Sequence, residues 1–159
     1  MSSRESRAVT GTGRFSHAIA EGDGISVIAA VLAPDEPALL GLVTRLLPPL
    51  VGGNAVVAVA SETRPLAAIE LAEAIATSDV PGGVVNILTG QTAELAPWLA
   101  SHMDVNAIDI GGADGLRADL EVAAAENVKR VVIGEPDAQS LYEISAFLEL
   151  KTVWHPIGQ

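Results

Sequence analysis

Short runs of apolar, often β-branched residues alternate along the chain with longer segments rich in alanine and leucine. Such runs, apolar at nearly every position, are typical of strands that are buried on both faces of a parallel sheet. The predicted strands are residues 25–32, 55–60, 84–88, 106–110 and 130–133. The predicted helices between them are residues 36–50, 65–77, 93–102 and 115–126. This alternation predicts the α/β class, with a doubly wound parallel sheet of about five strands.

The ends of these elements carry local signals. We expect Thr63 to cap the helix that begins at Arg64 and Pro65, where a proline in the first turn loses no hydrogen bond. Outside the alternating core, residues 13–21 predict an extra strand, residues 141–148 a helix and residues 151–155 an extended segment. The expected organisation is a tail (1–12), an extra strand (13–23), the α/β domain (24–135) and a terminal helix with a strand (136–159).

The charge, the hydrophobic content and the lack of cysteine exclude several classes of function. Nine Lys and Arg against twenty Asp and Glu give a net charge of −11, which repels nucleic acid and anionic membranes. Hydrophobic residues make up 49% and charged residues 18% of the chain, which favours either strands buried on both faces or a large subunit interface. No apolar run reaches the roughly 18 residues of a membrane span, and the first twelve residues contain no apolar core of a signal peptide, so we expect a cytoplasmic protein. The chain has no cysteine, which excludes disulfides, thiolate metal ligands and thiol nucleophiles.

One glycine-rich turn, residues 111–115, follows a predicted strand and precedes a predicted helix. Backbone N–H groups at such a turn can bind a phosphate. This turn lacks the GxGxxG spacing, and Asp114 would place a negative charge beside the phosphate. The alternative interpretation is a tight turn in which Asp114 interacts favourably with the helix dipole.

Acid and base candidates are scattered. The histidines, His17, His102 and His155, have no metal-ligand spacing, and we expect them to be structural or exposed. Asp35 and Glu36 follow the first predicted strand, and Glu135 follows the fifth, at the edge where parallel sheets bind ligands. They could bind a ligand or, for Glu135, act as a base. The alternatives are the opening of a helix for the pair and a solvated turn for Glu135.

Two segments resemble the aldehyde dehydrogenase family. The first is LPPLVGGNAVVAVASETRPLAAIELAEAIATSDVPGGVVNILTG at residues 47–90, and the second is the terminal FLELKTVWHPIGQ. The resemblance covers about residues 24–132 and the carboxyl terminus. It implies a Rossmann-like nicotinamide-binding half, with flanking strands that serve oligomerisation. The terminal strand implied to join subunits comprises Lys151, Thr152, Val153, Trp154 and His155.

The resemblance implies cofactor-binding positions at Ser61, Glu62, Gly112 and Ala113. The family's ribose-binding lysine corresponds to Val59, and its pyrophosphate-site serine corresponds to Ala113. These substitutions predict that no cofactor is bound, or NAD or NADP only weakly.

The chain also departs from the family's catalytic pattern. The family's catalytic domain, with its cysteine nucleophile, has no counterpart between residue 133 and the terminal segment. Its glutamate base corresponds to Gly134, with Glu135 one position late, and no asparagine stands at residues 33–36 for the oxyanion. We therefore expect no catalytic residue and no metal site.

These features favour a non-catalytic protein, a pseudoenzyme that forms a homodimer or larger homo-oligomer, or that joins a full-length aldehyde dehydrogenase. The alternative is an NAD(P)-dependent oxidoreductase in which Glu135 or a partner's residues supply the chemistry. A third interpretation is a small domain that binds an unrelated metabolite around Pro34, Ser61 and Gly112.

Overall fold

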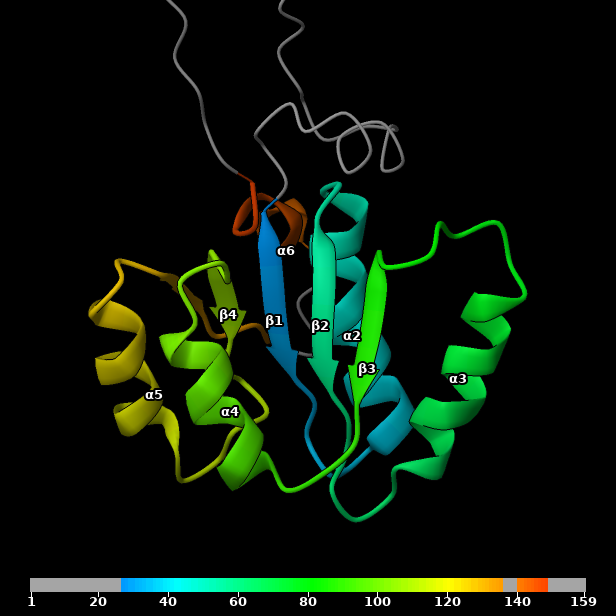
Figure 1. Ribbon diagram of the computed structural model, residues 1–159, viewed down its shortest axis with the longest axis horizontal. Helices are drawn as coiled ribbons and strands as arrows, with labels where there is room; N and C mark the ends of the chain where they lie inside the picture. The colour runs from blue at the N-terminus through cyan, green and yellow to red at the C-terminus, as the bar shows by residue number, and fades with distance from the viewer. Residues whose placement is uncertain (1–26, 136–139, 149–159) are drawn as a thin grey trace, which may run out of the picture.

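The computed structural model describes residues 27–135 and 140–148, and it contains one parallel sheet with helices on both faces (Figure 1). The strands are β1 (Ile28–Leu32), β2 (Ala55–Val59), β3 (Val85–Leu88), β4 (Ala107–Asp109) and β5 (Arg130–Val132). The helices are α2 (Ala38–Val51), α3 (Leu66–Ala76), α4 (Thr92–Ser101), α5 (Arg117–Ala125) and α6 (Leu141–Ser145). All five strands run parallel in the order β3-β2-β1-β4-β5, which confirms the predicted Rossmann-like α/β fold.

The alternation of side chains along β1 builds two cores. Ala30 and Leu32 pack toward α4 and α5, whereas Val31 and Ala33 pack toward α2 and α3. A third cluster joins Ala29 to Phe147, just after α6. The central strand is therefore buried on both faces, as its uniformly apolar sequence predicts.

The edge strand β3 differs from that expectation. Val85 and Ile87 pack against the α2–α3 side, but Asn86 and Leu88 are exposed on the other face. The prediction of burial on both faces was wrong for β3, because α4 packs mainly on β1 and β2 and leaves Asn86 and Leu88 exposed.

Predicted element boundaries differ from the observed ones by one to three residues. Gly115 has a φ of +83°, which no right-handed helix accommodates, so α5 begins at Arg117. Asn106 does not continue β4, because its side-chain Oδ1 accepts the N–H of Ile28 at 3.0 Å. The predicted helix at 141–148 is shorter, and ends at Ser145.

The predicted strands at residues 13–21 and 151–155 lie outside the described residues, and so do His17 and His155. No helix within residues 27–135 and 140–148 is long and apolar enough to cross a membrane.

Candidate functional site

The carboxyl ends of the strands gather at one edge of the sheet, at the bottom of Figure 1. β2 and β3 lie on one side of β1, and β4 and β5 lie on the other. The connections therefore diverge between β1 and β4, and open α/β sheets bind ligands at this kind of switch point. The carboxylates Asp35, Glu36 and Glu135 and the implied cofactor positions Ser61, Glu62, Gly112 and Ala113 lie in the loops at this edge.

Ser61 links the loops that follow β1 and β2. Its side chain is buried, and its hydroxyl donates to the Asp35 carboxylate at 2.9 Å and accepts the N–H of Arg64 at 3.0 Å. The same carboxylate oxygen accepts the N–H of Thr63 at 3.1 Å. The prediction that Thr63 caps α3 was wrong, because α3 begins at Leu66 without a side-chain cap. Ser61, and not Thr63, accepts a backbone N–H just before the helix, that of Arg64.

Asp35 and Glu36 do not open α2, whose first turn, starting at Ala38, contains no acidic residue. The Asp35 carboxylate instead accepts hydrogen bonds from Ser61 and Thr63. Glu36 forms an exposed ion pair with Arg64 at 2.7 Å. The N–H of Thr63, together with the Ser61 hydroxyl, holds the pKa of Asp35 below its ordinary value of 3.8.

This arrangement predicts a pH dependence that Asp35→Asn removes. Because the folded-state pKa of Asp35 lies below the unfolded one, its ionised form stabilises the fold above pH 3.8, and this stabilisation is lost as the pH falls through the folded-state pKa. We expect Asp35→Asn to be less stable near neutral pH and to lose less stability on acidification. Urea unfolding across the acid range measures this. An identical acid dependence in the variant and the parent would contradict it, and Ser61→Ala should give an intermediate profile.

Glu62 lies in the same loop but serves a different helix. Its Oε2 accepts the N–H of Thr92 at 3.1 Å, at the first residue of α4, which has no cap from its own Gln91. A carboxylate at this position satisfies an unpaired helix N–H and interacts favourably with the helix dipole. Glu62 therefore links the loop after β2 to the start of α4.

Val59, which precedes this loop, is completely buried in the core formed with α4 and α5. The position implied to hold a ribose-binding lysine is thus occupied by an apolar core side chain.

Gly112 lies where the β4–α5 turn crosses the loop after β1. A Cβ atom there would lie 2.7 Å from the carbonyl carbon of Ala33 and from the nitrogen of Pro34, and closer still to the oxygen of Leu32. Ala113 is buried in the core, and its N–H donates to the oxygen of Ile110 at 3.0 Å. The backbone at the switch point is therefore closely packed.

Asp114 is almost fully exposed and precedes α5 by three residues. Its carboxylate lies 3.9 Å from Nη2 of Arg117, so its described partner is this cation. Glu135, the candidate base, is exposed, and so is His102 at the end of α4. Among the described residues, no three His, Asp or Glu side chains gather in a way that could hold a metal ion.

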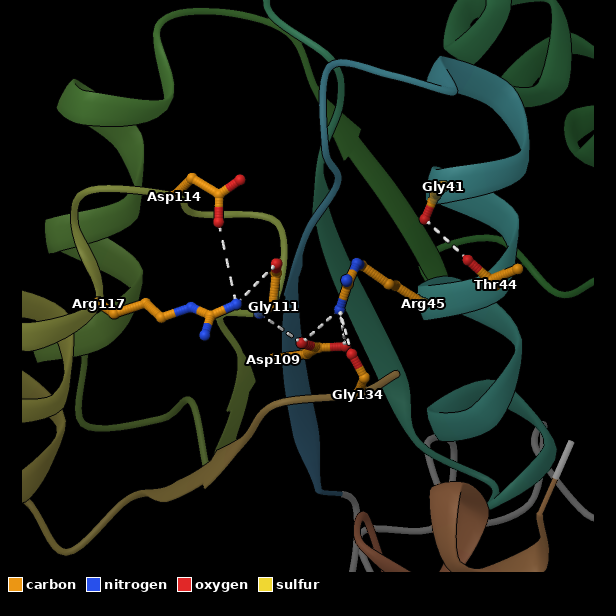
Figure 2. A network of polar contacts seen from close by, with 8 residues as sticks. All are labelled: Gly41, Thr44, Arg45, Asp109, Gly111, Asp114, Arg117 and Gly134. Carbon is orange, nitrogen blue, oxygen red and sulfur yellow. Dashed lines mark hydrogen bonds and ion pairs between the residues drawn. The ribbon is translucent and has the colours of Figure 1, made fainter. Parts of the chain in front are cut away.

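A buried ion pair beside the switch point was missed in the sequence. Arg45 of α2 donates through Nη1 to both carboxylate oxygens of Asp109 on β4, at 2.8 and 3.0 Å (Figure 2). Both side chains are nearly inaccessible to solvent. Asp109 also accepts the N–H of Gly111 at 2.8 Å, and Arg45 reaches the oxygen of Gly134 at 3.4 Å. The pair therefore ties α2 to the turns after β4 and β5.

The sequence contained a signal for this pair. Arg45 is the single charged residue of α2, and Asp109 is the single charged residue of β4. A lone charge in each of two apolar elements predicts pairing, because an unpaired buried charge is very costly.

Comparison with known proteins decides the family. Residues 7–136 match the profile described as "Aldehyde dehydrogenase family". The chain belongs to the aldehyde dehydrogenase family. This confirms the resemblance that residues 47–90 indicated, and the carboxyl-terminal segment lies outside the matched residues.

Solved aldehyde dehydrogenases share the fold. An indole-3-acetaldehyde dehydrogenase in the apo form is 34% identical, with a TM-score of 0.59, over 67% of this chain and 24% of that chain. A variant of aldehyde dehydrogenase C from Pseudomonas syringae, solved with NAD+ and octanal, is 29% identical, with a TM-score of 0.58, over 65% of this chain and 21% of that one. An aldehyde dehydrogenase from Bartonella henselae is 25% identical, with a TM-score of 0.58, over 65% and 22%. This chain therefore spans about a quarter or less of the enzymes it matches.

Proposed function

We propose that this aldehyde dehydrogenase family member is non-catalytic and acts by association, with itself or with a full-length aldehyde dehydrogenase. The main support for this proposal is that the residues at the implied cofactor-binding positions make contacts within the protein itself. Ser61 bonds to Asp35, Glu62 caps α4, Gly112 packs on the β1 loop, and Ala113 lies in the core. In addition, the 159 residues include no cysteine that could form a covalent adduct with an aldehyde.

The apolar outer surface of α2 and α6 supports association. Leu40, Leu47 and Val51 recur on α2 at helical spacing and are 61%, 48% and 52% exposed, and Leu141 and Tyr142 of the adjacent α6 are more than 80% exposed. Exposed apolar side chains gathered on adjacent helices favour an interaction site. The oligomerisation strand proposed from the sequence, Lys151 to His155, follows α6 along the chain and lies outside the described residues.

Removal of the terminal strand tests self-association. We expect the full chain to have a mass in solution that is a multiple of 16.3 kDa, and a chain ending at Leu148 to have a smaller one. Light scattering on both chains measures the masses, with circular dichroism as the control for folding. An unchanged mass after truncation would show that the terminal strand is not needed for self-association. If the full chain is monomeric alone, co-purification with a full-length aldehyde dehydrogenase decides whether it joins that enzyme, and failure of both would contradict association.

Titration with NAD+ and NADP+ tests the non-catalytic part of the proposal. Because Val59 offers no donor to a ribose hydroxyl, we expect no micromolar binding by calorimetry. Micromolar binding, or reduction of the cofactor with an aldehyde, would favour the alternative, an NAD(P)-dependent oxidoreductase of this family.

A further inference from the structure

The three residues that follow α6 are fixed through their backbone oxygens. The carbonyls of Ala146, Phe147 and Leu148 each accept a hydrogen bond from a side chain of another segment. Arg130 of β5 donates through Nη1 to the oxygens of Ala146 and Leu148, at 3.0 and 3.1 Å. Asn54, which precedes β2, donates through Nδ2 to the oxygen of Phe147 at 3.3 Å. We call these five residues the α6 clamp.

The α6 clamp also has an apolar anchor. Phe147 is 1% exposed and packs in one cluster with Ala29 of β1 and Ala107 of β4. The donor Asn54 is itself 3% exposed and reaches the oxygen of Pro49 at 2.8 Å, so α2 fixes its position. Apolar burial and directional hydrogen bonds therefore act on the same three residues.

The helix itself does not account for the α6 clamp. α6 has five residues, fewer than an isolated helix needs for stability, and its Leu141 and Tyr142 are more than 80% exposed. Its last turn is closed locally, because the N–H groups of residues 146–148 donate to the oxygens of Tyr142, Ile144 and Ser145. The three carbonyls of the clamp lie beyond this turn and are bound by β5 and by the turn between α2 and β2. The clamp therefore sets the position at which the described chain ends.

The α6 clamp is close in sequence to the predicted association strand. Lys151, the first residue of that strand, follows Leu148 by three residues, which span at most about 11 Å when fully extended. A fixed Leu148 therefore confines the start of the strand to a small region. Confinement of a binding segment before it binds lowers the entropic cost of association.

We propose that the α6 clamp positions the terminal strand, residues 151–155, for association with a second copy of the chain, and that Arg130 is the positioning residue. The inference rests on the proposed function, because it needs the strand to join subunits. Arg130 is decisive within the clamp, since an ionised guanidinium forms stronger hydrogen bonds than the carboxamide of Asn54 and holds the carbonyls on both sides of Phe147. Folding of β5 therefore places the strand.

Arg130→Met in the full chain tests the proposal. The change removes both hydrogen bonds of the guanidinium and keeps the strand, so the dissociation constant of the oligomer should rise about tenfold or more. Arg130 is half-buried on an edge strand, where methionine leaves no lone charge buried. Light scattering over a dilution series measures the constant, with circular dichroism as the control for folding.

Two further variants separate positioning from a general loss of stability. Arg130→Lys should recover part of the affinity, because an ammonium group can donate to both carbonyls. Arg64→Met, the same change at an exposed ion pair, is the matched control and should associate as the parent does. Equal dissociation constants for Arg130→Met and Arg64→Met, in a chain whose truncation after Leu148 lowers the mass, would overturn the positioning role and leave self-association standing.

Hydrogen exchange tests the α6 clamp independently of association. The amides of residues 146–148 should exchange faster in Arg130→Met than in the parent, because the backbone after α6 is held less firmly. Unchanged exchange would overturn the clamp in a monomer as well as in an oligomer. A parent chain that is monomeric at every concentration would contradict self-association itself, and with it the positioning role, even if exchange is faster in the variant.

Discussion

Arg45→Met is expected to destabilise the protein by about 3–5 kcal/mol, because it leaves the Asp109 carboxylate buried without its cation. Methionine fills much of the same volume, so the loss of packing is small and the uncompensated charge dominates. Asp109 would keep the N–H of Gly111, which cannot replace a guanidinium that donates to both carboxylate oxygens. Urea denaturation monitored by circular dichroism measures the change in the free energy of unfolding.

Arg64→Met is the matched control, since Arg64 pairs with Glu36 at 2.7 Å but both side chains are more than half exposed. Such a surface pair contributes about 0–1 kcal/mol. The double variant Arg45→Met, Asp109→Leu should recover part of the loss, because it buries no lone charge. An Arg45→Met protein as stable as Arg64→Met would show that Asp109 gains water or another donor.

The fold could be predicted because a strand that is buried on both faces of a sheet has an almost uniformly apolar sequence. Residues 28–32 read IAAVL, and the four residues after Ile28 are completely buried, on both faces of the sheet. The same reasoning fails at β3, since an apolar run does not reveal that one face of the edge strand stays exposed. Observed helix and strand boundaries differ from the predicted ones where the backbone conformation of a single residue ends the element, as the positive φ of Gly115 does before α5.

The candidate site could be predicted only in part, because its decisive contacts join distant segments. Ser61 was found by resemblance, but its partner Asp35 lies 26 residues earlier. Thr63 was a reasonable local cap, yet its own N–H donates to the Asp35 carboxylate, and the tertiary contact overrides the local preference. No periodicity contains that information. The Arg45–Asp109 pair was detectable as two lone charges, although their distance and burial were not.

Gly112→Ala is expected to destabilise the protein by about 3 kcal/mol, the upper part of the range for overpacking. The added methyl group would meet the backbone of Leu32, Ala33 and Pro34, and backbone cannot rotate away as a flexible side chain can. The loops after β1 and β4 would have to separate at the switch point. Urea denaturation measures the loss. Gly82→Ala is the control, since no atom lies within 4 Å of its added Cβ, and it should be neutral or slightly stabilising. If Gly112→Ala matched Gly82→Ala, the two loops would be loosely packed and the edge open to a dinucleotide, which would weaken the case for a non-catalytic protein.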